Sequence, residues 1–306
     1  WPLSRQNRPK QFIDLLDTSY TLLQMTYNRM TKVCPKENIL IVTGFPFRDL
    51  VEEQLPDIKT EQILVEPTRR NTAPCIAYAN ERIRAINPGA SIIVTPADHL
   101  IINEDRFVDV VKEGLAFIKD KDVLLSVGIK PNRPETDYGY VQIEDTSIKK
   151  GITKVKNFTE KPDAELANFF LESGEFFWNA GIYMWSLQSI TSAFEMYLPD
   201  IYELFAEQRE LYNKKGEQDY INRIYSGCKN ISIDYGIMEK AENVYVYCAD
   251  FGWSDLGTWR NLFDNHEKDE NNNVKNHDNI LTYDTQNTII TTTAQKITAI
   301  QGLDNY

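Results

Sequence analysis

The chain has 306 residues, 42% of them hydrophobic, which is enough to bury a substantial core in one large domain with a smaller appendage. Its 45 acidic side chains outnumber its 33 basic ones, and the formal net charge of −12 argues against a surface for nucleic acid or an anionic membrane, which needs a cationic face. Four scattered cysteines without a C-x-x-C pair, and no apolar segment of about 20 residues, make a cytoplasmic protein with reduced thiols the expectation.

The first half of the chain alternates short apolar runs with longer amphipathic stretches. In chain order we expect a helix over 12–30, a strand over 38–44, a helix over 48–55, a strand over 62–66, a helix with Thr72 as its N-cap, a buried strand over 91–95, a helix over 104–119 and a strand over 122–129. Strands separated by helices of this length predict a Rossmann-like α/β fold, with a mainly parallel sheet flanked by helices.

After residue 131 the pattern changes to shorter strands, at 139–144, 152–160 and 181–185, which predict a smaller antiparallel or mixed region beside the main sheet. Helices are expected over 187–197, 199–213 and near 232–241, followed by a strand over 244–248. The Asn-rich segment 266–279 has the composition of a linker, and the Thr- and Ile-rich segment 280–306 that of a small β appendage. The main domain would then cover 1–265.

Two acidic residues each follow a predicted strand. Asp98 ends the apolar run at 91–95, where ligands bind in open α/β sheets, and Asp255 lies in an aromatic loop after the strand at 244–248. Each also has a structural explanation: Asp98 could cap the helix near Asn103 or close a turn, and Asp255 could form an Asx turn. Taken alone, each residue favours the structural explanation.

Seven short motifs occur in order along residues 1–260. They are W-P-L-S-R with R-P-K-Q-F at 1–12, E-P-T-R-R-N-T-A-P at 66–74, P-A-D-H at 96–99, Y-G-Y at 138–140, F-T-E-K-P at 158–162, W-N-A-G at 178–181 and D-F-G-W-S-D-L-G-T-W at 250–259. Together they resemble the sugar-nucleotide pyrophosphorylases, and among these the mannose-1-phosphate guanylyltransferases. The resemblance implies a GT-A-like nucleotidyltransferase fold and a tail that begins a left-handed β-helix. In that family a strand and a glycine-rich loop precede W-P-L-S, so we expect residues before Trp1 to be missing.

The resemblance implies transfer of GMP from GTP to mannose 1-phosphate, with Mg²⁺ as cofactor. GTP and mannose 1-phosphate would be the small-molecule partners, and a homodimer or higher homo-oligomer is expected. The implied catalytic residues are Arg5, Lys10 and Lys161; the nucleotide-binding ones Glu66, Arg70, Asn71 and Thr72; the sugar-binding ones Gly139, Glu160 and Asn179; and the metal ligands Asp98 and Asp255.

Structural and functional alternatives stay open at this point. Without the resemblance, an ion pair with Lys161 explains Glu160, and a turn before Gly181 explains Asn179. A thymidylyl- or uridylyltransferase would keep the fold and change the substrates. The chain could also be a catalytically silent regulatory subunit, which would bind a sugar nucleotide in the same pocket without catalysing a reaction.

Overall fold

The computed structural model describes residues 3–144, 151–293 and 295–306, so Trp1 and Pro2 of the first motif lie outside it. The chain divides into two compact units, which are taken separately below. One unit combines residues 1–25, 98–100 and 254–306, and the other combines residues 26–97 and 101–253.

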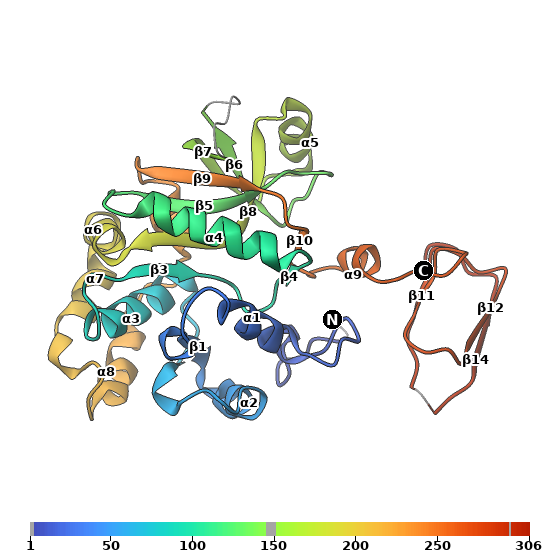
Figure 1. Cartoon of the computed structure of the whole chain (residues 1–306), viewed down its shortest axis with the longest axis horizontal. Coiled ribbons are helices and arrows are strands. Elements are labelled where there is room, and N and C mark those ends of the chain that lie inside the picture. Colours follow the sequence, from blue (N-terminus) through green and yellow to red (C-terminus); the bar gives the residue numbers. More distant parts are fainter. Residues whose placement is uncertain (1–2, 145–150, 294) are drawn as a thin grey trace. The chain divides into compact units, whose positions relative to one another are not determined.

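Most of the helices and strands are labelled in Figure 1. The helices are α1 (Leu22–Met30), α2 (Arg48–Gln54), α3 (Thr72–Arg84), α4 (Glu104–Ile118), α5 (Ala164–Ser173), α6 (Leu187–Tyr197), α7 (Pro199–Ala206), α8 (Glu217–Ile224) and α9 (Trp259–Asn265), with a π-helical turn, η7 (Asp234–Met238). The strands are β1 (Ile41–Gly44), β2 (Ile63–Glu66), β3 (Ser91–Val94), β4 (Leu100–Ile101), β5 (Leu124–Ile129), β6 (Gly139–Ile143), β7 (Ile152–Glu160), β8 (Phe176–Ser186), β9 (Val244–Ala249), β10 (Trp253–Ser254), β11 (Val274–Lys275), β12 (Ile280–Tyr283), β13 (Ile289–Ile290) and β14 (Thr298–Gln301).

A six-stranded sheet in the order β3-β8-β5-β9-β7-β6 forms the centre of the larger unit. The long strand β8 also pairs with β6 through its first residues and then runs beside β5, and the ladder is irregular where it changes partner. The change of partner falls at Asn179, which pairs with Gly128 of β5.

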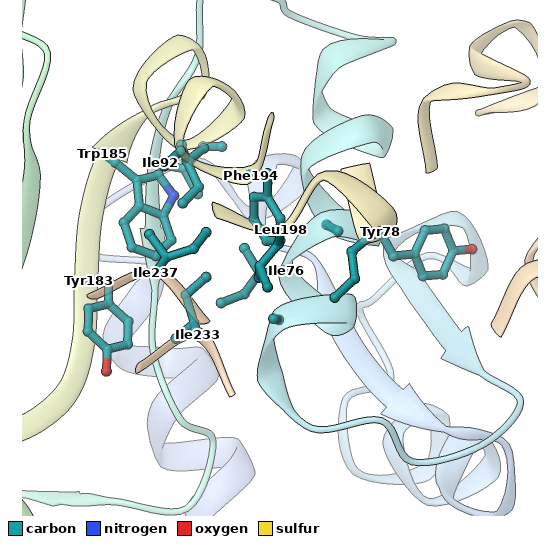
Figure 2. Packing of buried hydrophobic residues seen from close by; sticks show 14 of the residues in the cluster. Ile76, Tyr78, Ile92, Tyr183, Trp185, Phe194, Leu198, Ile233 and Ile237 are labelled. Atoms are coloured by element: carbon teal, nitrogen blue, oxygen red, sulfur yellow. The ribbon is translucent and has the colours of Figure 1, made fainter. Parts of the chain in front are cut away.

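The two faces of β8 pack against different helices because successive side chains of a strand point to opposite faces. Met184 lies on the face of α4, where a Cβ at Gly114 would overlap its side chain. Tyr183 and Trp185 lie on the other face and stack with ring centroids 5.5 Å apart. They join a large apolar cluster with Ile76 of α3 and residues of α6 and η7 (Figure 2).

The mixed α/β fold with flanking helices is confirmed, but its strand pairing differs from the expectation. The parallel pairs of the larger unit are β1–β2 and β5–β9. Strand β3, expected in a parallel arrangement, instead pairs antiparallel with β8, and Ser91 at its start is exposed. The short strands β6 and β7 belong to the central sheet and do not form a separate region. Apolar runs indicate burial but not strand direction, and this limits the prediction.

The helix expected over 12–30 is wrong for its first half, where the structure has only a 3₁₀ turn at Lys10–Phe12 before α1. The Asp14 carboxylate accepts hydrogen bonds from the backbone N–H groups of Leu16, Thr18 and Ser19, and this local turn competes with the helix. The helix begins at the next capping signal, a reciprocal pair between Thr21 and Gln24.

The C-terminal segment forms short parallel ladders, in which β11 pairs with β13 and β12 with β14. Such stacking of successive coils is the pattern expected for a β-helix-like appendage. Strand β11 lies inside the range expected to be a linker, and the buried Asn273 amide binds the backbone of the next coil at Thr285 and Thr288. Asn273 therefore links successive coils by hydrogen bonds, a role that composition alone does not reveal.

None of the helices in the described part of the chain has the length and apolar character that crossing a membrane requires.

Candidate functional site

Lys10 joins the two acidic residues singled out in the sequence. Its Nζ lies 3.3 Å from Asp98 Oδ2 and also donates a short hydrogen bond to the backbone carbonyl of Asp255. These residues are far apart in the chain and belong to the same compact unit. Lys10, Asp98 and Asp255 therefore come from three segments that meet.

Asp255 is held by the turn that follows it. Its Oδ1 accepts from the backbone N–H of Gly257 at 3.0 Å and from Asn261 Nδ2 at 2.9 Å, so the Asx turn considered from the sequence is present. Leu256 has a positive φ of 50° and packs on Leu22, which fixes the loop. The turn and a ligand role are compatible, because the two oxygens of a carboxylate can together accept about four interactions.

Asp98 does not cap the following helix, because Asn103 does so with its own side chain, which accepts from the N–H of Arg106 at 3.0 Å. Besides Lys10, Asp98 contacts its neighbour His99, with Nε2 3.7 Å from Oδ1. Arg5 lies in a tight hairpin, where it exchanges backbone hydrogen bonds with Arg8, and its side chain is exposed.

A second group of residues, in the larger unit, surrounds the end of β7. Gly139 of β6 faces Glu160 across the ladder, and a Cβ at Gly139 would overlap Glu160 Oε2, so any larger residue there would displace this carboxylate. The neighbouring Lys161 has φ +48°, a conformation rare outside glycine and asparagine, and its N–H donates to Tyr138 O at 3.2 Å. Such a residue is often found at a functional site.

The ion pair between Glu160 and Lys161 that the sequence allowed is present, with Oε1 and Nζ 3.6 Å apart, yet the two side chains differ in exposure. The Glu160 side chain is 14% exposed and that of Lys161 59% exposed. Burial and the negative charge of Asp234 raise the pKa of Glu160 to about 7, and Lys161 opposes this shift. Near neutral pH the carboxylate is thus close to its titration midpoint.

Asn179 lies at an irregular point inside β8, and its side chain accepts from the N–H of Gly181, which has φ +68°. The turn-like explanation given from the sequence is therefore partly right. The Asn179 amide also binds two residues that the sequence analysis missed, Tyr183 and Asp234. No local pattern marks them, because Asp234 reaches Asn179 only through the tertiary fold.

The residues assigned to the nucleotide lie along one loop between β2 and α3. Glu66 accepts a 2.9 Å hydrogen bond from the Tyr225 hydroxyl, and burial raises the pKa of its carboxyl group. The Arg70 guanidinium binds the backbone carbonyls of Tyr225 and Ser226, both at 3.3 Å. Arg70 therefore uses its Nε and Nη2 groups to anchor the loop to residues 225 and 226.

Asn71, and not Thr72, is the N-cap of α3. Its side chain accepts from the N–H of Thr72, and its φ of +66° is one that asparagine tolerates. The Thr72 hydroxyl instead accepts from the N–H of Ile233 at 2.8 Å. The expectation of Thr72 as the cap was wrong by one residue.

Residues 1–272 match the family model described as nucleotidyl transferase, and the chain belongs to that family. It is 34% identical to a mannose-1-phosphate guanylyltransferase of Escherichia coli over 98% of the chain and 66% of that relative, and 35% identical to one of Sinorhizobium fredii over 99% and 59%. The chain thus spans about three fifths to two thirds of the length of these curated relatives.

A solved structure has the same fold. It is described as a mannose-1-phosphate geranyltransferase from Thermus thermophilus, with a TM-score of 0.85 and 27% identity, and the match covers 99% of this chain and 85% of that one.

Proposed function

We propose that the protein transfers GMP from GTP to mannose 1-phosphate, which yields GDP-mannose and pyrophosphate. The observation that carries the proposal is the contact of Lys10 with Asp98 and with the carbonyl of Asp255, because it brings a cation and two carboxylate-bearing segments together. Membership of the nucleotidyl transferase family and the similarity to the guanylyltransferases of two bacteria support the choice of reaction.

The chemistry requires positioning and charge neutralisation. A phosphate monoester has a second pKa of about 6, so the sugar phosphate is largely dianionic near neutrality and needs no dedicated base. One of its oxygens attacks the α-phosphorus of the nucleotide in line, the bond from that phosphorus to the bridging oxygen breaks, and pyrophosphate leaves with the electron pair. Lys10 and Arg5 would stabilise the charge that grows on the leaving group, and Lys161 would hold the sugar phosphate.

Asp98 and Asp255 would supply the two carboxylate ligands of a magnesium ion. Mg²⁺ favours one or two carboxylates together with substrate oxygens and water, so two carboxylates suffice. Within residues 3–144, 151–293 and 295–306 no cluster of three or more acidic, His or Cys side chains is arranged to hold a metal, so substrate and solvent would have to complete the shell. The bound ion would neutralise phosphate charge.

Recognition of the base and of the sugar would use residues of the larger unit. Asn71 and Thr72 lie at the start of α3, where an anion or a ribose hydroxyl finds polar partners, and Glu66 offers a carboxylate on the same loop. Glu160, Asn179 and the narrow space at Gly139 would select the hydroxyl pattern of the sugar.

The test is pyrophosphate release by the purified protein, with GTP, dTTP or UTP paired with mannose 1-phosphate or glucose 1-phosphate. The proposal predicts the highest kcat/KM for GTP with mannose 1-phosphate, and loss of turnover on chelation of the metal that Mg²⁺ reverses. A preference for dTTP or UTP would identify another sugar-1-phosphate nucleotidyltransferase. Binding of sugar nucleotide without turnover by any pair would identify a sensing subunit.

We also propose a cytoplasmic location and assembly into a homodimer or higher homo-oligomer. The four cysteines, at 34, 75, 228 and 248, are free thiols, which suits a reducing compartment. Light scattering of the purified protein would give the oligomeric state.

A further inference from the structure

We propose that Asp234 is a positioning residue for the sugar site, which together with Tyr183 fixes the Asn179 amide so that it meets the substrate as a hydrogen-bond acceptor only. The inference rests on the proposed function and extends it to a residue with no role there. It predicts which kind of sugar group Asn179 recognises.

The hydrogen bonds of Asn179 determine which atom of its amide can bind a ligand. Its Nδ2 donates to the Tyr183 hydroxyl at 2.9 Å and to Asp234 Oδ1 at 3.0 Å, and its Oδ1 accepts from the N–H of Gly181 at 3.2 Å. An amide nitrogen carries two hydrogens, and both are engaged. One lone pair of the carbonyl oxygen remains for a ligand, so a sugar hydroxyl must donate to it.

The neighbours also fix which end of the amide is which. The backbone N–H of Gly181 can only donate, so it requires the carbonyl oxygen on its side. The Asp234 carboxylate can only accept when ionised, so it requires the nitrogen. The Tyr183 hydroxyl donates a short hydrogen bond to the same Asp234 oxygen and accepts from Asn179, which closes a ring of three. A flipped amide would break two of these contacts.

The two partners are themselves held by the core. Tyr183 is 3% exposed and stacks on Trp185. Asp234 is the first residue of η7, and the buried Ile233 and Ile237 lie on either side of it in the sequence, within the cluster shown in Figure 2. A π-helical turn is rare and is frequently found at functional sites. Packing in the core therefore holds Tyr183 and Asp234 in place around Asn179.

The segment that carries Asp234 also forms hydrogen bonds with the loop between β2 and α3, which contains the residues assigned to the nucleotide. The N–H of Ile231 donates to Arg70 O at 3.3 Å, the N–H of Ala73 donates to Ile231 O at 3.2 Å, and the N–H of Ile233 donates to the Thr72 hydroxyl. A substitution that only weakened the packing of this segment would weaken the binding of both GTP and mannose 1-phosphate. One that only released the Asn179 amide would disturb the sugar alone, and this difference separates positioning from general structure.

The first experiment compares Asp234→Ala, Asp234→Asn and the control Ser232→Ala, which removes a bond to the N–H of Tyr235 on the same turn and leaves the Asp234 ring intact. We expect Asp234→Ala to raise the KM for mannose 1-phosphate about tenfold or more, as for a lost bond to a charged group, with the KM for GTP changed less than twofold. Asp234→Asn keeps an accepting oxygen and should recover most of the loss. Ser232→Ala should leave both KM values within twofold. Equal increases in both KM values, or no increase, would overturn the inference.

The second experiment uses monodeoxy and monofluoro analogues of mannose 1-phosphate. Fluorine does not donate a hydrogen bond, so at the hydroxyl that meets Asn179 the fluoro and deoxy analogues should bind equally weakly to the wild-type protein. In Asp234→Ala the fluoro and deoxy penalties at that position should both shrink. Fluoro analogues that bind as well as the parent at every hydroxyl would contradict the acceptor-only role.

Calorimetric titration with GTP and with mannose 1-phosphate separates the two proposals. Wild-type protein that binds both ligands without turnover, together with a selective loss of sugar-phosphate binding in Asp234→Ala, would overturn the proposed reaction alone. Normal wild-type turnover with unaltered sugar-phosphate affinity in Asp234→Ala would overturn the positioning role alone. Failure of the wild type to bind mannose 1-phosphate would overturn both.

Discussion

Arg82 and Glu217 form a buried ion pair, with Nη1 2.7 Å from Oε1 and side chains 11% and 8% exposed. The same carboxylate oxygen accepts from the Tyr78 hydroxyl at 2.9 Å, and the other oxygen accepts from the N–H of Asn213 at 2.7 Å. The pair ties the last turn of α3 to the start of α8 inside the larger unit.

Glu217→Ala should therefore destabilise the protein by about 3 kcal/mol or more, because removal of one partner leaves the Arg82 charge buried without compensation. The matched control is Glu52→Ala, which breaks the exposed pair with Arg48 on α2 and should change the free energy of unfolding by about 0.5 kcal/mol or less. Urea titration of both variants measures the difference. Equal effects would show that burial of the pair contributes nothing.

Lys10→Met removes the charge but keeps most of the apolar stem. If Lys10 stabilises the leaving pyrophosphate, kcat should fall about 100-fold or more, the usual effect of removing one preorganised donor at a developing charge. The free energy of unfolding should change by about 1 kcal/mol or less, since the contact with Asp98 is partly exposed. Stopped assays of pyrophosphate release give the first quantity, and urea titration gives the second.

The control for Lys10 is Arg8→Ala, which removes a nearby exposed cation whose backbone pairs with Arg5. Turnover of this variant should stay within threefold of the wild type. Undiminished turnover in Lys10→Met would remove Lys10 from the mechanism. A similar loss in both variants would assign the effect to the general charge of the loop.

Gly139→Ala places a methyl group where Glu160 Oε2 lies. The Glu160 side chain must move, so the KM for mannose 1-phosphate should rise about tenfold while the KM for GTP stays within twofold. Gly89→Ala is the control, because its Cβ would meet only Asn87 Oδ1 at 3.6 Å, an ordinary contact. Unchanged sugar kinetics in Gly139→Ala would show that the position of this carboxylate does not matter for recognition.

The sequence predicted elements well where the signal was local. The helices over 187–197 and 104–119 appear as α6 and α4 within one residue, because a Ser or Asn cap precedes each apolar repeat. The helix over 12–30 failed for an equally local reason, since the Asp14 turn outweighed the apolar spacing. Whether a strand is parallel or antiparallel depends on the strand that it pairs with. The partner of β3 is β8, which lies far along the chain, so a local pattern does not reveal the direction.

The same division applies to the site. Glu160, Lys161 and Gly139 could be assigned because each lies in a motif, and their contact follows from the pairing of β6 with β7. Asp234 and Tyr183 could not be assigned, because a tyrosine in an apolar strand indicates core and a lone aspartate indicates a cap. Only the fold shows that both bind the Asn179 amide.

The raised pKa of Glu160 predicts how sugar affinity changes with pH. Burial and the nearby Asp234 set this pKa to about 7, with Lys161 opposing them and Glu239 contributing in the same direction as Asp234. Below pH 7 the carboxyl group is increasingly protonated and becomes a weaker acceptor for a sugar hydroxyl, so the KM for mannose 1-phosphate should rise as the pH falls from 8 to 6. Because the substrate phosphate also titrates near 6, the comparison is with Glu160→Gln, in which the part of the change due to the protein should be absent.

The same shift predicts an effect on stability of definite sign. The pKa of Glu160 is higher in the folded protein than its ordinary value of 4.5, so between these values the folded state binds more protons than the unfolded state. Stability therefore falls as the pH rises from about 4.5 to about 7 and is unaffected by this group outside that window. Urea titrations of wild type and Glu160→Gln across pH 4.5 to 8 should give a difference in the free energy of unfolding that grows over this range and then levels off. A difference that is independent of pH would mean that Glu160 titrates normally, and a difference of opposite sign would mean that Lys161 dominates its environment.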